Sequence, residues 1–446
     1  MIDLSTNIQA QNILTTCALC GDYPVFAIDL IPHDSRHYLL KVIRQLKEER
    51  YISETGREKM RSIRILKKGL RFLESTAPNL SRQYAIQTNN GQFSGYLPRK
   101  ERELRISETI QIMRLADVKT GAYEKPVLYE IGASDIKDTE NYSDANAFAA
   151  ISVQPPYPVQ PSSSPQPYSL RNANISVPAV EKPAADVHPA AERAAGLVPL
   201  FYVSKEVKNN DINGLLRTSY TRTVGLYVTP VGWYGVFNLG DGLCEWNTAS
   251  EAKSCEQMRM TCKVNGWLDG SRIMERNSII IARNTDVAVR MMRVTDEAAG
   301  GVRFRADGKS TRNRYIRFDE TYDTSFFVPA NENGARMLRI LAAPNFRDRI
   351  LEACLDDDIR LDPMKATVIA DGRNAEGEYF YLFFDSELRR LRGFRDSMKI
   401  RNIPLSKCLV ACFPWQEPIV REYLGEEARI KTIGMDAIEK AVFENT

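Results

Sequence analysis

The sequence predicts a multidomain α+β protein: a small unit of helices and a β-hairpin at the N-terminus, a proline-rich linker, and a C-terminal α/β domain with a mixed sheet. The chain has 446 residues, more than one ordinary hydrophobic core accommodates. Nine prolines stand between Pro155 and Pro189, in a stretch without core-forming periodicity that we expect to be disordered. Beyond this stretch, predicted strands and helices alternate, as they do in α/β domains.

These features divide the chain into four parts. We expect a first domain over residues 1–78, a helical extension with one strand over 79–146, the linker over 147–196 and the α/β domain over 197–446. The extension has a predicted helix at Pro98–Val118 and a strand at Val127–Ile131. The last hundred residues predict strands at Ala366–Ala370, Tyr379–Phe384, Cys408–Phe413 and Ile430–Ile433, with helices at Ser386–Met398, Glu417–Leu424 and Met435–Phe443.

The composition favours a soluble, cytoplasmic protein. Apolar residues make up 43% and charged residues 26% of the chain, which is ordinary for globular domains. The longest uncharged apolar runs are short, such as Cys408–Trp415, so we expect no membrane span. The N-terminal residues lack the basic start and apolar core of a secretory signal. The eight cysteines are therefore expected to be buried thiols rather than disulfides.

The N-terminal unit is predicted element by element. Ser5 or Thr6 can cap a first helix, which Gly21 ends. Apolar residues at helical spacing continue in a short second helix and in a third. Two short strands joined by a charged turn then predict a hairpin, followed by a closing helix. The expected helices are Ser5–Cys20, Val25–Leu30 and Asp34–Glu49, with strands at Tyr51–Ser53 and Ser62–Leu66.

Positive charge is concentrated in this unit. From Arg36 to Arg71 there are twelve lysines or arginines against four glutamates, a net charge of +8, while the whole chain carries +3. The remainder is therefore net acidic. A solvated basic surface would explain such a run, but here the charges coincide with the third helix and the hairpin. This pattern predicts a local site for a polyanion.

The first 75 residues resemble winged helix-turn-helix domains, most clearly over Gln45–Leu73, the sequence QLKEERYIS…RSIRILKKGLRFL. The resemblance implies that double-stranded DNA is the partner, with the third helix in the major groove and the hairpin, or wing, against the backbone or minor groove. The residues expected to read bases are His37, Lys41, Arg44 and Gln45. The residues expected to contact phosphates are Arg57, Lys59, Arg61, Arg64, Lys67 and Lys68.

The whole chain also resembles, more weakly, replication-relaxation-type proteins of plasmids and integrative mobile elements, which place a winged helix before an α/β domain. That resemblance implies a replication, maintenance or transfer factor of a bacterial mobile element. Its partners would then include other replication or transfer proteins, and a homodimer is a further expectation. A winged-helix transcriptional regulator is an alternative.

One metal pattern competes with this prediction. Cys17, Cys20, His33 and His37 have the ligand spacing of a two-cysteine, two-histidine zinc finger. Pro32 would interrupt the finger helix just before His33, and the two cysteines fall in a predicted helix rather than a hairpin. We therefore expect no metal and no other cofactor, although the spacing leaves zinc binding open.

Enzymatic motifs are sparse. The chain has no phosphate-binding loop and three histidines, His33, His37 and His188, so a non-enzymatic role is the more direct interpretation and no catalytic residue is assigned. The alternative is a metal-dependent nuclease with a restriction-endonuclease-like core. Such a core requires acidic residues on two neighbouring strands to bind the metal ion. Asp241 and Glu245 are the candidates, but the Glu-x-Lys motif of such nucleases does not follow. A core that resembles a nuclease but has lost its motif is a further form of this alternative.

Two basic segments are candidates for extending the nucleic-acid surface. They are the residues around Lys309 and the helix with Arg389, Arg390, Arg392 and Arg395.

Overall fold

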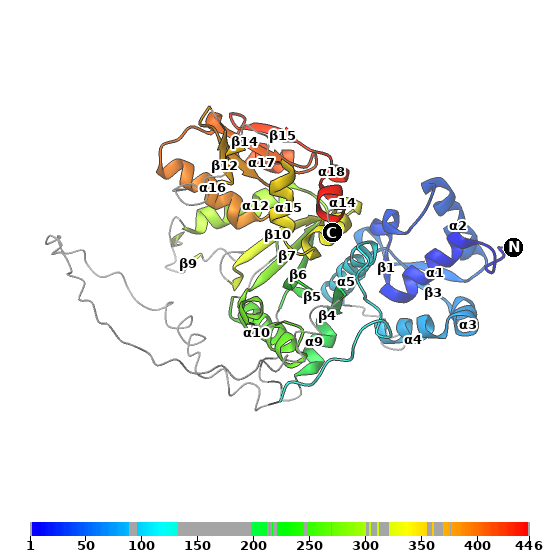
Figure 1. Cartoon of the computed structure of the whole chain (residues 1–446). Helices are drawn as coiled ribbons and strands as arrows, with labels where there is room; N and C mark the ends of the chain where they lie inside the picture. Colours follow the sequence, from blue (N-terminus) through cyan, green and yellow to red (C-terminus); the bar gives the residue numbers. More distant parts are fainter. Residues whose placement is uncertain are drawn as a thin grey trace.

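The chain forms a mixed α/β structure with several sheets (Figure 1). This computed structural model describes residues 2–88, 96–132, 198–211, 214, 216, 221–244, 248–268, 270–299, 303–304, 310–311, 321–354, 359–360, 369–374 and 376–444. The expected linker, residues 147–196, lies outside the described residues. Among the helices that are described, none is both long and apolar enough to cross a membrane.

The N-terminal unit contains the predicted elements in the predicted order, and the structure adds the short strand β1, the single turn η2 and the helix α4. Its helices are α1 (Ile8–Cys20), η1 (Val25–Leu30), α2 (Arg36–Glu48), η2 (Glu58–Met60), α3 (Lys67–Thr76) and α4 (Pro78–Gln87). Its strands are β1 (Tyr23–Pro24), β2 (Ile52–Thr55) and β3 (Ser62–Ile65). They form an antiparallel sheet in the order β1-β3-β2. The unit is thus a helical cluster closed on one side by the hairpin.

The cap of α1 differs from the expected one by one or two residues. Asn7, rather than Ser5 or Thr6, accepts a hydrogen bond from the Ala10 backbone N–H at 2.9 Å. Both of those residues instead hydrogen-bond to Asp3 through their hydroxyl groups. Gly21 ends the helix with φ at 82°, a left-handed conformation that glycine adopts at little cost.

Helix α5 (Leu97–Leu115) joins the N-terminal unit to the rest of the chain. On one side the Ser107 hydroxyl donates to the Cys20 carbonyl at 2.7 Å, and the Gln111 amide donates to the Leu30 carbonyl at 2.8 Å. On its other side Thr109 accepts a hydrogen bond from Asn238 in the large sheet. Figure 1 shows α5 between the N-terminal helices and this sheet. The hydrophobic core is continuous across all three layers.

The first large sheet has the order β10-β7-β6-β5-β4. Strands β4, β5 and β6 form an antiparallel meander, and β7 and β10 continue parallel to β6. Side chains of β6 alternate between two cores, one shared with α5 and the other on the opposite face. Both faces are covered, which explains why these strands are apolar on both sides. Their bounds are Leu200–Val203, Thr223–Thr229, Gly232–Gly240, Asn277–Ala282 and Thr324–Pro329 for β4, β5, β6, β7 and β10.

The second large sheet, β11-β12-β13-β14-β15, repeats this arrangement. Its first three strands are antiparallel and its last two run parallel to β13. The last hundred residues therefore form a mixed sheet, which agrees with the predicted fold class. The strand expected at Ala366–Ala370 is absent from the described part of that range, residues 369–370. The bounds are Ile359–Arg360, Gly372–Asn374, Tyr379–Leu382, Cys408–Cys412 and Arg429–Thr432.

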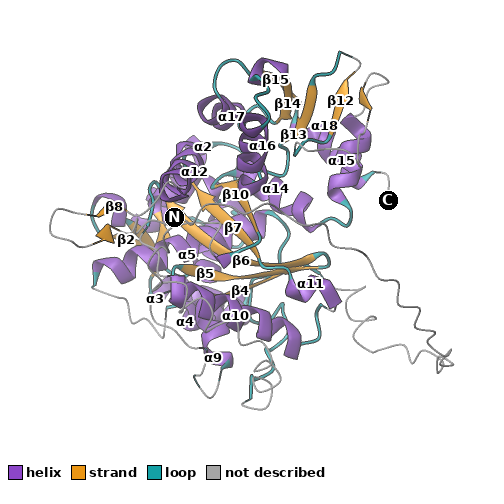
Figure 2. Cartoon of the chain, turned by 90° about the vertical axis from the view of Figure 1, so that its left-hand side faces the viewer, coloured by secondary structure: helices purple, strands orange, loops and turns teal. Residues whose placement is uncertain are grey.

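Helices accompany both sheets (Figure 2), and the third, fourth and fifth strands of each sheet are followed by helices in the chain. In the first they are α9 (Ser204–Asn210), α10 (Thr248–Val264), α11 (Gly270–Met274), α12 (Asp286–Ala299) and α14 (Glu332–Ala342). In the second they are α15 (Phe346–Cys354), α16 (Leu388–Ile400), η4 (Leu405–Lys407), α17 (Glu417–Leu424) and α18 (Met435–Phe443). A short hairpin, β8 (Arg303–Phe304) and β9 (Ser310–Thr311), lies apart from both sheets.

The residues on either side of the expected linker lie against each other. Lys119 pairs with the segment at Leu200 through two backbone hydrogen bonds of 3.0 and 2.9 Å. Ile131 forms an isolated bridge to Asp211. This bridge is all that the structure shows of the strand expected at Val127–Ile131. The chain therefore leaves and re-enters the described structure along one edge of the first sheet.

Candidate nucleic-acid interface

The outer face of α2 presents cations without acidic partners. The inner face of the helix buries Leu39, Val42, Ile43 and Leu46, so the residues between them point outward. His37, Lys41 and Arg44 are exposed, and Gln45 is partly exposed. Within the part of the chain that the structure describes, none of His37, Lys41 and Arg44 forms an ion pair.

The cations at the two ends of α2 are neutralised. Arg36 lies 2.7 Å from Asp29, and Lys47 lies 2.7 Å from Glu54 on β2. The side-chain hydrogen bonds from Lys47 and Arg61 hold the pKa of Glu54 below its usual range, against the opposing effect of burial. The unpaired positive charge of α2 is therefore confined to its middle.

The turn of the β2–β3 hairpin exposes Arg57 and Lys59, and Arg61 next to it is also exposed. Gly56 has φ at 87° there, so a glycine suits this turn. Lys59 lies 3.8 Å from Asp241, which follows β6, while its own side chain is 82% exposed. Such an exposed pair contributes little stability and leaves the lysine accessible.

Arg64 is placed differently from the other predicted phosphate contacts. It donates two hydrogen bonds to the carboxylate of Asp22, at 3.2 and 2.8 Å, and its side chain is 19% exposed. A bidentate pair of this kind fixes the guanidinium against the protein. At the start of α3, Lys67 and Lys68 are exposed, and Lys68 lies 3.9 Å above the Tyr51 ring.

The cysteines of the zinc pattern lie inside α1. Cys17 and Cys20 are buried in the core, and burial raises the pKa of the Cys20 thiol to about 12. His37 is exposed on α2, and His33 contacts the Ile31 carbonyl at 2.7 Å. Among the described residues, no three His, Cys, Asp or Glu side chains are grouped so that they could hold a metal ion.

A polar cluster that sequence reasoning missed joins the hairpin and η1 to the large sheet. Arg283, just after β7, lies 2.9 Å from the buried Glu108 of α5 and 2.8 Å from Asp241. Its guanidinium carbon lies 3.5 Å from the centre of the Phe26 ring. Asp241, considered above as a nuclease carboxylate, is thus bound by arginine, and its proposed partner Glu245 lies outside the described residues.

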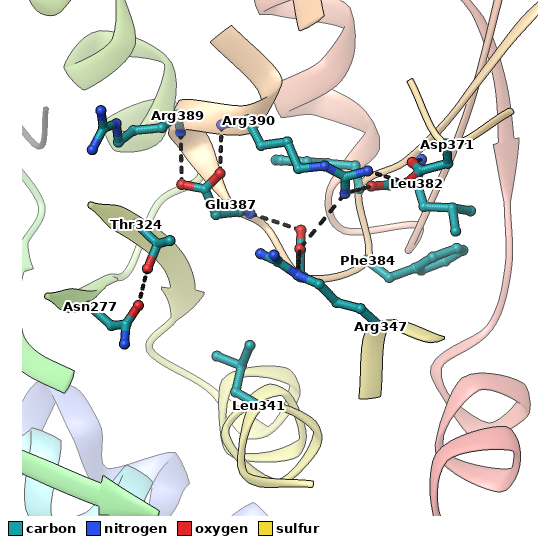
Figure 3. Close-up of polar contacts among 12 residues, drawn as sticks. Asn277, Thr324, Leu341, Arg347, Asp371, Leu382, Phe384, Glu387, Arg389 and Arg390 are labelled. Atoms are coloured by element: carbon teal, nitrogen blue, oxygen red, sulfur yellow. Dashed lines mark hydrogen bonds and ion pairs between the residues drawn. The ribbon is translucent and has the colours of Figure 1, made fainter. Parts of the chain in front are cut away.

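A second acidic group, also missed from the sequence, flanks the hairpin β12–β13. Asp371 precedes β12, and Asp385 and Glu387 follow β13; burial raises the pKa of Asp371 and of Glu387. Arg390 forms ion pairs with both aspartates, and Arg347 lies 2.9 Å from Asp385 (Figure 3). Like Asp241, Asp385 thus follows the third strand of its sheet and is bound by arginine.

The carboxylate oxygens of this group are all engaged. Glu387 caps α16 by accepting from the backbone of Arg389 and Arg390, and it also accepts from the Ser325 N–H. Asp371 accepts from the Leu382 N–H at 2.7 Å. Arg390 and the backbone N–H groups therefore occupy the acceptor positions that a cation would need. The acid-x-acid spacing of Asp385 and Glu387 was the sequence signal that could have drawn attention to the group.

The arginines of α16 face the protein. Arg392 and Arg395 lie 2.9 and 2.6 Å from Asp296 of α12, and Arg389 donates to the carbonyls of Tyr322 and Asp323. Arg390 is also paired, so all four of these arginines make contacts within the protein. The basic segment around Lys309 lies outside the described residues.

Comparison of the chain with protein-family models, curated proteins and solved structures gives no significant match in any of the three.

Proposed function

We propose that this chain is a duplex-DNA-binding protein whose N-terminal unit acts as a winged helix-turn-helix. The observation that carries the proposal is the middle of α2, where His37, Lys41 and Arg44 are exposed without acidic partners. Ion pairs neutralise both ends of the same helix. A cationic helix face of this kind suits entry into the major groove, where phosphates flank the base edges.

The hairpin supports the same function. It follows α2 directly and pairs antiparallel with β1, which is the element order of the winged domains that this unit resembles. Arg57 and Lys59 at its turn are exposed and accessible to a phosphate backbone. Lys67 and Lys68 are further phosphate candidates. We assign Arg64 a structural role instead, because Asp22 holds it.

The biological role that fits best is a replication, maintenance or transfer factor of a bacterial mobile element. Its support is the weaker resemblance of the whole chain, together with the presence of an α/β body behind the DNA-binding unit. Other replication or transfer proteins and a second copy of the chain remain the expected partners. A transcriptional regulator would instead select sites beside promoters, so sequencing the DNA recovered with the protein distinguishes the two roles.

The proposal is tested by measuring the binding of the full-length protein to a labelled 30-base-pair duplex by fluorescence anisotropy at several salt concentrations. The Lys41→Ala/Arg44→Ala variant should bind all duplexes more weakly than the wild type does. Lys263→Ala is the matched control, because this exposed lysine lies on α10, away from the N-terminal unit (Figure 1). Equal affinity of the double variant and the wild type would contradict the proposal.

The alternative is a metal-dependent nuclease, for which Asp371, Asp385 and Glu387 are the nearest set of acidic residues, although no three described side chains are grouped so that they could hold a metal ion. Against it, Arg390 occupies the space between the two aspartates. Incubation with supercoiled plasmid and Mg²⁺ or Mn²⁺ decides between the two functions. Nicking that is abolished in Asp385→Asn would favour the nuclease, and intact plasmid favours binding alone.

A further inference from the structure

The exposed face of α2 has an apolar residue at its centre. Leu40 is 41% exposed, although three other large aliphatic residues of the same helix, Leu39, Val42 and Leu46, are fully buried. Isolated exposed leucines are common on protein surfaces. Leu40 differs in its surroundings, because its helical neighbours one turn away on this face are His37 and Arg44.

The charge on α2 surrounds this leucine. His37, Lys41 and Arg44 have no ion-pair partner among the described residues, whereas Arg36 and Lys47 at the two ends have one each. A protein partner that covered Leu40 would have to bury or neutralise these three side chains. A DNA duplex would satisfy the cations with phosphates and base acceptors while offering Leu40 an apolar surface.

The apolar group that DNA presents in its major groove is the C5-methyl of thymine. We propose that Leu40 is a specificity-determining residue that contacts a thymine methyl group, between polar contacts made by its charged neighbours. This proposal rests on the DNA-binding function proposed above. It goes beyond that function by naming the thymine methyl group as what Leu40 recognises.

The test removes only the methyl group. A preferred duplex is selected from a random pool with the full-length protein, and each thymine in it is replaced in turn by deoxyuridine. At one or two positions the replacement should weaken binding of the wild type by about threefold to tenfold, as expected for losing one buried methyl contact. Leu40→Ala should bind thymine and uracil duplexes equally at those positions.

Two control variants make the result specific. Lys41→Ala should lose affinity for both duplexes and keep the difference between them. Val127→Ala removes a highly exposed apolar side chain from a segment outside α2 and should leave binding unchanged. Leu40 is partly exposed, so its truncation is expected to leave the fold intact; a thermal melt checks this.

Three outcomes would overturn the proposal. If the wild type binds duplex DNA but no thymine is sensitive to loss of its methyl group, the role of Leu40 is wrong and the proposed function stands. If Leu40→Ala still binds the thymine duplex more tightly than the deoxyuridine duplex, and its sedimentation without DNA differs from that of the wild type, Leu40 belongs to an interface between protein copies. If no duplex is bound or enriched, the proposed function itself fails.

Discussion

The guanidinium carbon of Arg283 lies 3.5 Å from the centre of the Phe26 ring, and this contact joins the N-terminal unit to the first large sheet. Phe26 belongs to η1, directly before α2, while Arg283 follows β7. The negative face of an aromatic ring attracts a cation that lies over it. The same guanidinium is bound to Glu108 of α5, so one side chain connects three elements, and we expect the N-terminal unit to be held firmly against the body.

Loss of Arg283 should destabilise the protein strongly. Arg283→Met removes the cation that neutralises Glu108, whose side chain is 2% exposed. Breaking a buried ion pair from one side typically costs about 3–5 kcal/mol. Urea denaturation should show a lower free energy of unfolding by about this amount. The double variant Glu108→Gln/Arg283→Met should recover part of it, and a single variant as stable as the wild type would contradict this role.

Arg57 should contribute to DNA binding, whereas Arg64 should contribute to the stability of the fold. Arg57→Ala should reduce the slope of log K against log salt by about one unit, as expected for one lost phosphate contact. Arg64→Ala should leave the slope unchanged and lower the free energy of unfolding by about 1–3 kcal/mol, because it leaves Asp22 without its charged hydrogen bonds. Salt titrations and urea denaturation of both variants check this, and a reversed pattern would refute the assignment.

Asp296 should give a pH dependence of stability in the acid range. Burial acts to raise the pKa of Asp296, but hydrogen bonds from Arg395, Arg392 and Tyr423 outweigh it and place the pKa below the usual 3.8. A carboxylate with a lowered pKa stabilises the folded state above its unfolded pKa, and this stabilisation is lost as the pH falls through the folded pKa.

The variant Asp296→Asn isolates this effect. Near pH 7 the wild type should be more stable than the variant by about 1–3 kcal/mol, and the difference should shrink as the pH falls below 3.8. Thermal denaturation at a series of pH values measures it. A difference that does not change with pH would show that the charge of Asp296 is not the source.

A zinc chelator should change neither the stability of the protein nor its binding to DNA. Zinc binding needs the cysteines as thiolates, and burial raises the pKa of Cys17 well above its usual value and that of Cys20 to about 12. Treatment with 1,10-phenanthroline should leave both the melting temperature and duplex binding unchanged. Stoichiometric zinc in the purified protein, lost together with DNA binding, would reverse this conclusion.

Local patterns were enough to predict the first three helices, the hairpin and α3 of the N-terminal unit, but not β1, η2 or α4. Apolar spacing and glycines located α1, α2 and the hairpin within a few residues, because these features act over one or two turns of chain. The pairing of Arg64 with Asp22 joins residues 42 positions apart. No pattern within the hairpin distinguishes Arg64 from Arg57, so their different environments could not be predicted.

The larger architecture depends on long-range contacts that the sequence does not display. Helix α5 has a wide apolar side because it packs against both the N-terminal unit and the large sheet, but its sequence did not show what would cover each face. The two sheets repeat the same order of strands, and this order depends on pairing between segments that are far apart in the sequence. The acidic group of Asp371 and Asp385 forms only when β12 and β13 pair.

The salt dependence of duplex binding tests the central claim most directly. The dissociation constant of the full-length protein and of Lys41→Ala/Arg44→Ala is measured by anisotropy between about 50 and 200 mM salt, the range over which phosphate contacts change affinity strongly. The DNA-binding account predicts a steep slope for the wild type and a slope about two units smaller for the variant. No binding to any duplex, or the same slope for both proteins, would contradict it.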